Sequence, residues 1–376
     1  MKKIIGILLA GALVTSAFAV DFNAKVKMSG DILGGTIDLN GDDKDDSSFN
    51  ALKLNNGIVD NNDLLTTSFT GDKAGAALNV TLDDRVMKIA SAKVWIQPID
   101  MLKITFGQQA WEAWSETTYT YGRKNAWGRD WANESEEPGF DFLITPVGGL
   151  EFDVGFKPGW NTPWVSVANN KVALGCWNIG AKVDLNSFAG IPVGILANFK
   201  NAVDGENNIS QITVGALYGN QWGGGLSAHL VARIGFAKGL DDGKIGNGWG
   251  SGSKDKNSMI IDNGVKYDAG AFKVWASVPV LIDLDTDNDA DNKSSTALGF
   301  VVKAQYQVGS ITPWVKLSQT DMTVGKFADF KFKPKVELGA DFDVGSCKMG
   351  ISAAATIPGE KENLSWSVPF WATISF

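Results

Sequence analysis

The chain has 376 residues, with 42 acidic against 34 basic side chains, and carries a formal net charge of −8. This acidity argues against a nucleic-acid partner, because phosphate binding needs clustered Lys and Arg. The mean hydropathy is −0.04, and no apolar block of about 20 residues follows the N-terminal region, which excludes a helical membrane protein. The length would allow two or three soluble domains, but no linker divides the chain, which favours one closed body.

The N-terminus has the parts of a secretory signal peptide. Lys2 and Lys3 precede the apolar run Ile4–Val14, which is too short to span a bilayer, and Ala17-Phe18-Ala19 forms a small-x-small cleavage site. We expect residues 1–19 to be a cleaved signal peptide and residues 20–376 to form the exported protein.

Short alternating segments follow one another between residues 22 and 109, with turn residues between them. Successive side chains of a strand point to opposite faces, so each segment predicts a strand with one apolar face and one polar face. The order of the segments predicts a series of antiparallel hairpins. They are Ala24–Gly30 with its continuation to Gly35, Leu65–Gly71, Ala74–Leu82, Ala92–Ile96 and Leu102–Gln109.

The longest connection that follows these strands, residues 110–138, gathers aromatic and charged side chains. A loop of this kind inside a barrel would set the pore radius and the electric field. Its rings also suit stacking on sugars, whereas packing against the barrel wall or in an aromatic girdle is the simpler alternative. We predict a pore constriction that contacts solutes through Trp111, Glu112, Trp114, Glu116, Tyr119, Tyr121, Arg123, Lys124, Trp127, Arg129, Asp130 and Trp131.

Alternation is clearest later in the chain, in Phe330–Val344, where even positions are apolar and odd positions are charged or glycine. Shorter alternations at residues 151–157 and 302–308 follow the same rule. This pattern predicts lipid on one face and a polar interior on the other. The loop is rich in acids and the strand in lysines, so the sign of the interior field stays open. The predicted inward-facing charges are Lys103, Lys303, Lys331, Lys333, Lys335, Glu337, Asp341 and Asp343.

The connections alternate in length. Short turns are expected at residues 98–100, 146–149, 186–191, 220–225, 269–270, 309–310 and 345–346, and longer polar loops at residues 158–171, 201–208, 239–257, 284–295 and 318–329. Long loops on one rim and short turns on the other are typical of outer-membrane barrels. We therefore predict an all-β fold, a transmembrane antiparallel up-and-down β-barrel of 16–18 strands. A large secreted β-sandwich or β-helix is the alternative fold.

The last strand puts one continuous apolar face on alternate residues from Trp366 to Phe376, with serines and a threonine on the other face. A terminal strand that ends in Phe resembles the signal by which bacterial outer-membrane barrels are recognised for insertion. Phe376 is therefore the expected insertion signal, read by the barrel-assembly machinery.

The order of features from Phe22 to Gln109, followed by the loop at residues 110–138, resembles the opening of a bacterial general porin. The resemblance implies a homotrimer and a constriction loop folded into the barrel. General porins usually set wall arginines against that loop, whereas this chain has only Arg85, Arg123, Arg129 and Arg233. Lysine does not replace arginine in rigid bidentate roles, so the family's charge mechanism is not carried over. The low arginine content also resembles the surface porins of spirochaetes.

Other candidate chemistry is weak. Cys176 and Cys347 are predicted to face opposite sides of the wall and to stay unbridged, and no metal site is expected. The acidic residues 283–291 depart from a calcium loop because Ala290 stands where Gly is needed, so a solvated loop is the simpler interpretation. His229 shares a face with Ser227, but a lone strand histidine predicts no catalysis.

The sequence therefore predicts an outer-membrane porin of a diderm bacterium, without cofactor or enzymatic activity, that lets ions and small hydrophilic solutes diffuse through a water-filled channel. Its expected partners are membrane lipid and these solutes. Two alternatives stay open: a sugar-selective porin that uses residues 110–138, and a non-conducting surface adhesin or antigen on a barrel scaffold.

Overall fold

The structure, a computed structural model, describes residues 21–37, 47–54, 65–83, 86–109, 137–157, 165–168, 171–174, 176–204, 207–219, 224–238, 258–278, 280–283, 296–324, 332–358 and 363–376. These residues are almost entirely antiparallel strands. Among them, no helix has the length and apolar character needed to cross a membrane.

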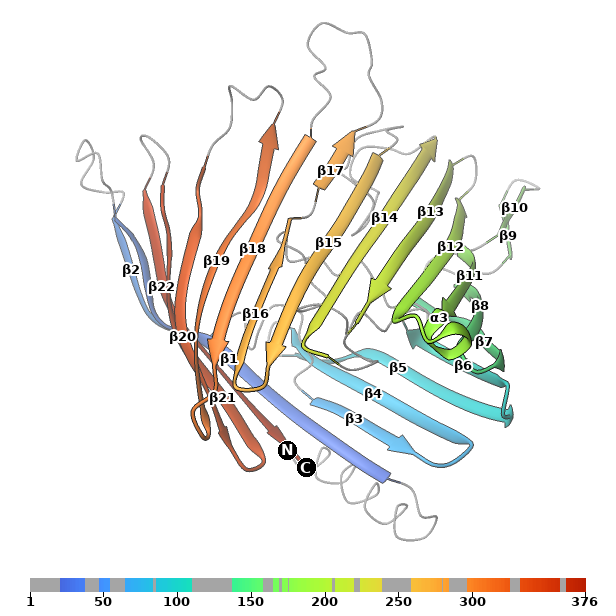
Figure 1. Cartoon of the computed structure of the whole chain (residues 1–376), viewed down its shortest axis with the longest axis horizontal. Helices are drawn as coiled ribbons and strands as arrows, with labels where there is room; N and C mark the ends of the chain where they lie inside the picture. The colour runs from blue at the N-terminus through green and yellow to red at the C-terminus, as the bar shows by residue number, and fades with distance from the viewer. Residues whose placement is uncertain are drawn as a thin grey trace, which may run out of the picture.

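One closed sheet contains nearly all of the described strands (Figure 1). Its 20 strand segments form 18 wall strands, because β2 and β3 both pair with β1, and β16 and β17 both lie between β15 and β18. The upper end of the predicted range is confirmed. The wall consists of β1 (Asp21–Ile37), β2 (Ser48–Leu54) with β3 (Leu65–Thr70), β4 (Ala74–Asp83), β5 (Val86–Ile99), β6 (Leu102–Gln109), β7 (Glu137–Val147), β8 (Leu150–Lys157), β11 (Cys176–Asp184), β12 (Val193–Asp204), β13 (Asn207–Tyr218), β14 (Leu226–Lys238), β15 (Ser258–Ala269), β16 (Phe272–Ser277) with β17 (Val280–Asp283), β18 (Thr296–Tyr306), β19 (Ile311–Val324), β20 (Lys335–Val344), β21 (Cys347–Thr356) and β22 (Leu364–Ser375).

The first and last strands close the barrel. β1 and β22 pair antiparallel from Lys25↔Ser375 to Ile37↔Leu364, with one register shift between Asp31 and Leu33. The backbone of Phe376 continues this pairing, since its N–H donates to the Ala24 carbonyl at 2.8 Å and its carbonyl accepts from the Ala24 N–H at 3.1 Å. Closure leaves no free sheet edge, which is the condition for strands to cross a bilayer.

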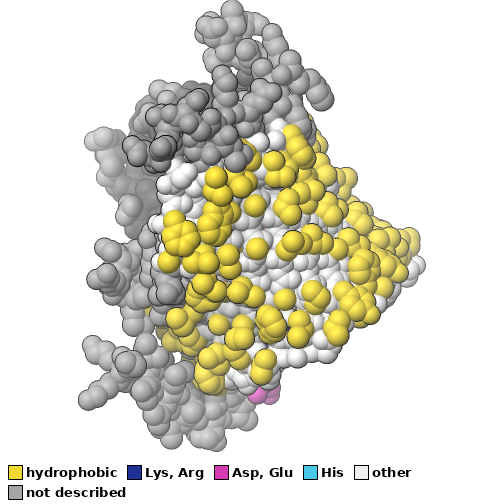
Figure 2. Space-filling model, turned by 90° about the vertical axis from the view of Figure 1, so that its left-hand side faces the viewer, with side chains coloured by type: hydrophobic (Ala, Val, Ile, Leu, Met, Phe, Trp, Pro, Cys, Tyr) yellow, Lys and Arg dark blue, Asp and Glu magenta, His cyan; other side chains and the backbone are white. Residues whose placement is uncertain are grey.

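The two faces of the wall differ as the alternation predicts. Exposed large apolar side chains lie at alternate positions, including Val315 and Leu317 on β19 and Leu338 on β20. Their neighbours in sequence, such as Lys316 and Glu337, are charged and face the interior. Figure 2 shows one outer face, whose described side chains are mainly apolar, with acidic atoms only at its lower edge. This outer surface matches the apolar band, about 25 Å tall, of a transmembrane barrel.

The connections partly follow the prediction. Tight turns occur at Gly270, Gly309 and Gly345, each with a positive φ that favours glycine. The turn expected at residues 186–191 contains a short helix, α3 (Leu185–Ala189). The prediction of a loop at residues 201–208 is wrong, because β12 and β13 pair as far as Asp204↔Asn207. A separate hairpin of β9 (Val165–Ala168) and β10 (Lys171–Leu174) occupies part of the segment expected to be a loop at residues 158–171.

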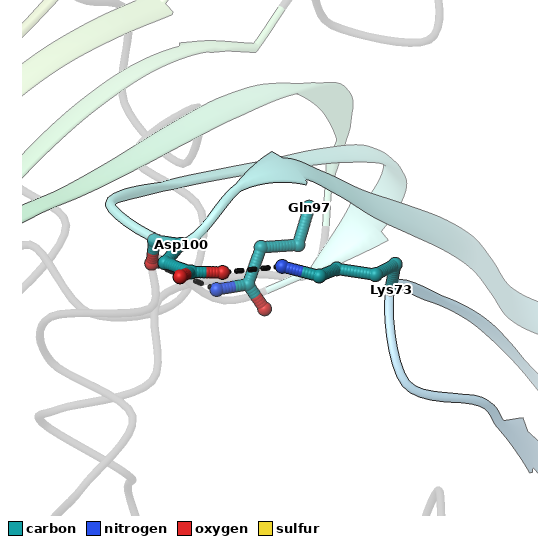
Figure 3. A network of polar contacts seen from close by, with 3 residues as sticks. All are labelled: Lys73, Gln97 and Asp100. Carbon is teal, nitrogen blue, oxygen red and sulfur yellow. Dashed lines mark hydrogen bonds and ion pairs between the residues drawn. The ribbon is translucent and has the colours of Figure 1, made fainter.

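Two neighbouring short turns are joined by polar contacts (Figure 3). The Lys73 ammonium, in the β3–β4 turn, forms a hydrogen-bonded ion pair with the Asp100 carboxylate, in the β5–β6 turn. The Gln97 side chain donates to the Asp100 carbonyl at 2.8 Å, and the Gln97 N–H donates to the Lys73 carbonyl at 2.7 Å. The hydrogen bond from Lys73, and its charge, hold the pKa of the Asp100 carboxyl below its usual range.

One wall strand is interrupted between β16 and β17, and a side chain on β15 forms hydrogen bonds to the backbone at the interruption. Asn263 on β15 donates from Nδ2 to the Val278 carbonyl at 2.7 Å and accepts from the Val278 N–H at 3.1 Å. Asn263 stands on the same face as the exposed Val265 and Tyr267. Its amide therefore supplies the two hydrogen bonds that a neighbouring backbone would give, where lipid offers none.

Replacing Asn263 with Leu should destabilise the barrel by about 2–5 kcal/mol, because the Val278 N–H and carbonyl would then lie unpaired at the lipid face. The free energy of unfolding in urea, measured in lipid vesicles, tests this. Val265→Leu alters the same face of β15 without touching that pair of hydrogen bonds and is the matched control. An equal, small effect of both substitutions would contradict the role of Asn263.

The Lys73–Asp100 contact should make stability depend on pH in the acidic range. A carboxylate with a lowered folded-state pKa stabilises the fold above its unfolded pKa of about 3.9 and loses that effect as the pH falls through its folded pKa. Asp100→Asn should therefore be less stable than the unaltered protein near neutral pH, and the two should converge in strong acid. Urea unfolding at both pH values measures this. Asp72→Asn, in the same β3–β4 turn, changes the charge equally and should lack the effect.

Candidate functional site

The interior wall of the barrel is the candidate site. The strand register places six of the eight predicted interior charges on the inward face: Lys103, Lys303, Lys335, Glu337, Asp341 and Asp343. Lys333 precedes β20, and its N–H donates to the Gln319 side-chain oxygen at 2.8 Å. Lys331 and the twelve predicted contact residues between Trp111 and Trp131 lie outside the residues that the structure describes.

Inward lysines form ion pairs along the wall. Glu337, on β20, lies 2.7 Å from the Lys316 ammonium on β19 and 3.0 Å from the Lys335 ammonium. Asp268 similarly pairs with Lys273 at 2.9 Å and with Lys266 at 3.5 Å. Of the interior lysines predicted from the sequence, Lys335 is among these ion pairs, and the pairing with Glu337 lowers the local field that it produces.

Three tryptophans lie flat against the interior wall over glycines. The register pairs Trp95 with Gly75, Trp314 with Gly339 and Trp371 with Gly350. A Cβ atom added at these glycines would lie 2.3, 2.5 and 2.2 Å from the respective indoles. Each ring therefore occupies the space that a side chain on the next strand would need.

Lysine ammonium groups lie on these indole faces. Lys303 stands between two rings, with its Nζ 4.3 Å from the Trp314 ring centroid and 5.2 Å from that of Trp275. On the β5–β6 side of the barrel, the Lys103 Nζ lies 5.1 Å from the Trp95 ring centroid. Such contacts hold a cation by its attraction to the ring face while its stem packs along the wall.

Carboxylates are buried on another part of the wall. Asp141 on β7 and Asp153 on β8 are both fully buried, with Thr105 of β6 beside them. Next to them the Lys182 ammonium on β11 lies 3.5 Å from the Glu151 carboxylate. In the closed order of strands, β6–β11 lies across the barrel from β18–β21. Asp141 and Asp153 therefore lie across the barrel from Trp314 and from the ion pair of Lys316 with Glu337.

Sequence reasoning missed the interior tryptophans. Trp95, Trp275 and Trp314 stand on the inward faces of their strands, whereas Trp366 stands on the outward face, in contact with Phe49 at 6.2 Å between ring centroids. The signal was present, because Trp371 belongs to the serine face of the last strand, but the glycines opposite these rings become visible only when the register is known.

The remaining candidates for chemistry bring no constellation together. His229 pairs in register with Leu217 and Gly264, so its immediate cross-strand neighbours are not catalytic partners. The register places Cys347 outward, as predicted, and Cys347 is a free thiol. Within the described ranges, no group of His, Cys, Asp and Glu could hold a metal ion.

Comparison with known proteins identifies the fold. No family model matches the chain, and no curated protein matches it in sequence. Among solved structures it is similar to OpdQ of Pseudomonas aeruginosa, with a TM-score of 0.52 and 8% identity, over 95% of this chain and 98% of that chain. OpdL of the same organism gives 0.52 and 11% over the same shares. OpdK of that organism, solved with vanillate, gives 0.50 and 9%, again over 95% and 98%. The chain has the 18-stranded fold of bacterial outer-membrane porins.

Replacing Glu337 with Gln should free two interior ammonium groups and increase anion permeability relative to cation permeability. The reversal potential across a planar bilayer with a salt gradient measures this change. Loss of both ion pairs should also cost about 1–3 kcal/mol of unfolding free energy, because both lysines keep access to water.

Asp343→Asn is the control for this experiment. It removes the same formal charge from the ion pair between Asp343 and Lys348, in which both side chains are exposed. A shift in reversal potential as large as that of Glu337→Gln would show that net charge, and not the position of Glu337, controls permeability.

Proposed function

We propose that this protein is a passive, water-filled channel of a bacterial outer membrane for ions and small hydrophilic solutes. One observation carries the proposal: a closed wall of 18 strands has an apolar outer face and a charged inner face. A barrel of this number of strands is wide enough to leave an aqueous channel. Solutes would move down their concentration gradient, so no cofactor or energy source is required.

We also propose that the predicted constriction loop narrows this channel. It ends at residue 136 and not at residue 138, because Glu137 and Pro138 belong to β7. The loop leaves the wall at Gln109 on β6 and returns at Glu137 on β7, two residues that are direct partners in the sheet. The segment thus begins and ends on the side of the barrel that carries Asp141 and Asp153. Its aromatic and charged residues, including Trp114 and Arg123, are suited to setting the width and field of a pore.

Export and assembly follow from the same proposal. Residues 1–19 would direct secretion and be removed, and Phe376, which is 69% exposed on the outer face, would serve as the insertion signal for the assembly machinery. Assembly as a homotrimer and a relationship to the surface porins of spirochaetes stay predictions of the sequence resemblance.

Deletion of Trp114 to Trp131 tests the constriction. Discrete ohmic current steps across a planar bilayer are expected for the mature chain, and the deletion should raise the single-channel conductance by roughly twofold or more, because the narrowest section of the path dominates its resistance. Replacing the same segment with a Gly-Ser linker of equal length separates the effect of its side chains from that of its length. Unchanged conductance in both variants would contradict the proposed constriction. If the protein inserts but the bilayer carries no current, the proposed channel function is wrong.

A further inference from the structure

A polar and aromatic surface lies on the interior wall of β19–β22. It is formed by Trp314, Asp341 and Trp371, on β19, β20 and β22. The Trp314 indole N–H donates to Asp341 Oδ1 at 3.1 Å. The same Asp341 oxygen lies 2.7 Å, and Trp371 Nε1 lies 2.2 Å, from the position that a Cβ on Gly350 would occupy. One carboxylate is therefore adjacent to both indoles.

The shape of this surface follows from its glycines. Trp314 lies over Gly339 and Trp371 lies over Gly350, so each indole occupies the space that a side chain on the neighbouring strand would fill. The face of the Trp314 ring carries the Lys303 ammonium at 4.3 Å. Among the described residues, no other ring or cation contacts Trp371. Trp371 thus offers a partly exposed flat apolar face beside hydrogen-bonding groups.

The charges around this surface are balanced. Lys303 lies close enough to Asp341 for their charges to attract each other. Further charges on these strands are ion-paired, Lys348 with Asp343 at 3.3 Å and Lys316 with Glu337 at 2.7 Å. A site with compensated charges neither attracts nor repels an ion strongly, which disfavours a charged ligand as its specific occupant.

A flat apolar face next to a carboxylate and an ammonium has the chemistry to bind a pyranose. The C–H face of a sugar ring packs on an indole, while its hydroxyl groups donate to a carboxylate and accept from an ammonium. Ser29 on β1 is the direct partner of Trp371, and its hydroxyl can both donate and accept a hydrogen bond. An aliphatic solute would leave these polar groups unpaired, at a cost in free energy.

We propose that Trp371, Asp341 and Trp314 form a binding site for uncharged pyranose sugars near the short-turn end of the channel. The inference rests on the proposed channel function and names a solute class for it. Trp371 is the stacking surface, Asp341 accepts hydrogen bonds from the sugar, and Trp314 and Lys303 hold Asp341 in place.

Sugar-induced interruption of the ion current tests the site. Maltotriose, added to the bilayer chamber, should block single channels reversibly and in proportion to its concentration. Polyethylene glycol of equal hydrodynamic size should reduce the conductance without discrete blocks. Trp371→Leu should raise the half-blocking sugar concentration by about tenfold, and Asp341→Asn should raise it by a smaller factor.

Trp366→Leu is the matched control, because Trp366 stands on the same strand but on the outward face. It should leave both the conductance and the sugar block unchanged. Two outcomes would contradict the sugar site but not the channel function. One is an open channel that maltotriose does not block, and the other is an equal effect of Trp371→Leu and Trp366→Leu on the block. A barrel that inserts and conducts no current would overturn both proposals.

Discussion

The closed wall of this molecule depends on the need to satisfy backbone hydrogen bonds where no water is present. Strands in lipid meet this need only when the sheet closes on itself. The pairing of β1 with β22, extended by the backbone of Phe376, removes the free edge. The same constraint explains Asn263, whose amide completes the hydrogen bonding of Val278 where the wall strand is interrupted. Closure then separates an outer surface that contacts lipid from an inner surface that is free to carry charge.

The inner surface has two recurring arrangements of side chains. Carboxylates pair with lysines, as Glu337 does with Lys316 and Lys335, so that charges near a low-dielectric wall are compensated. Glycines opposite tryptophans let indole rings lie flat, as Trp371 does over Gly350. Together they give an inner wall that carries paired charges and indole rings placed over glycines.

The distribution of these groups around the barrel connects the fold to transport. Asp141 and Asp153 lie across the barrel from Trp314 and Asp341. A solute that crosses the channel would therefore meet surfaces of different chemistry on its two sides. Gln109 and Glu137, between which the proposed constriction lies, pair on β6 and β7, the strands that carry Thr105 and Asp141.

Sequence alone determined the alternation, and with it the fold class, the two faces of the wall and the approximate number of strands, because a period of two residues is imposed by strand geometry whatever the partners are. It also predicted Lys303, Glu337 and Asp341 as interior residues. Only the tertiary structure decided which strands are direct neighbours, because register depends on contacts between residues far apart in the chain. The pairing of Glu337 with Lys316, the rings over Gly339 and Gly350, and the contact of Trp314 with Asp341 all depend on that register. No pattern within a single strand could therefore reveal them.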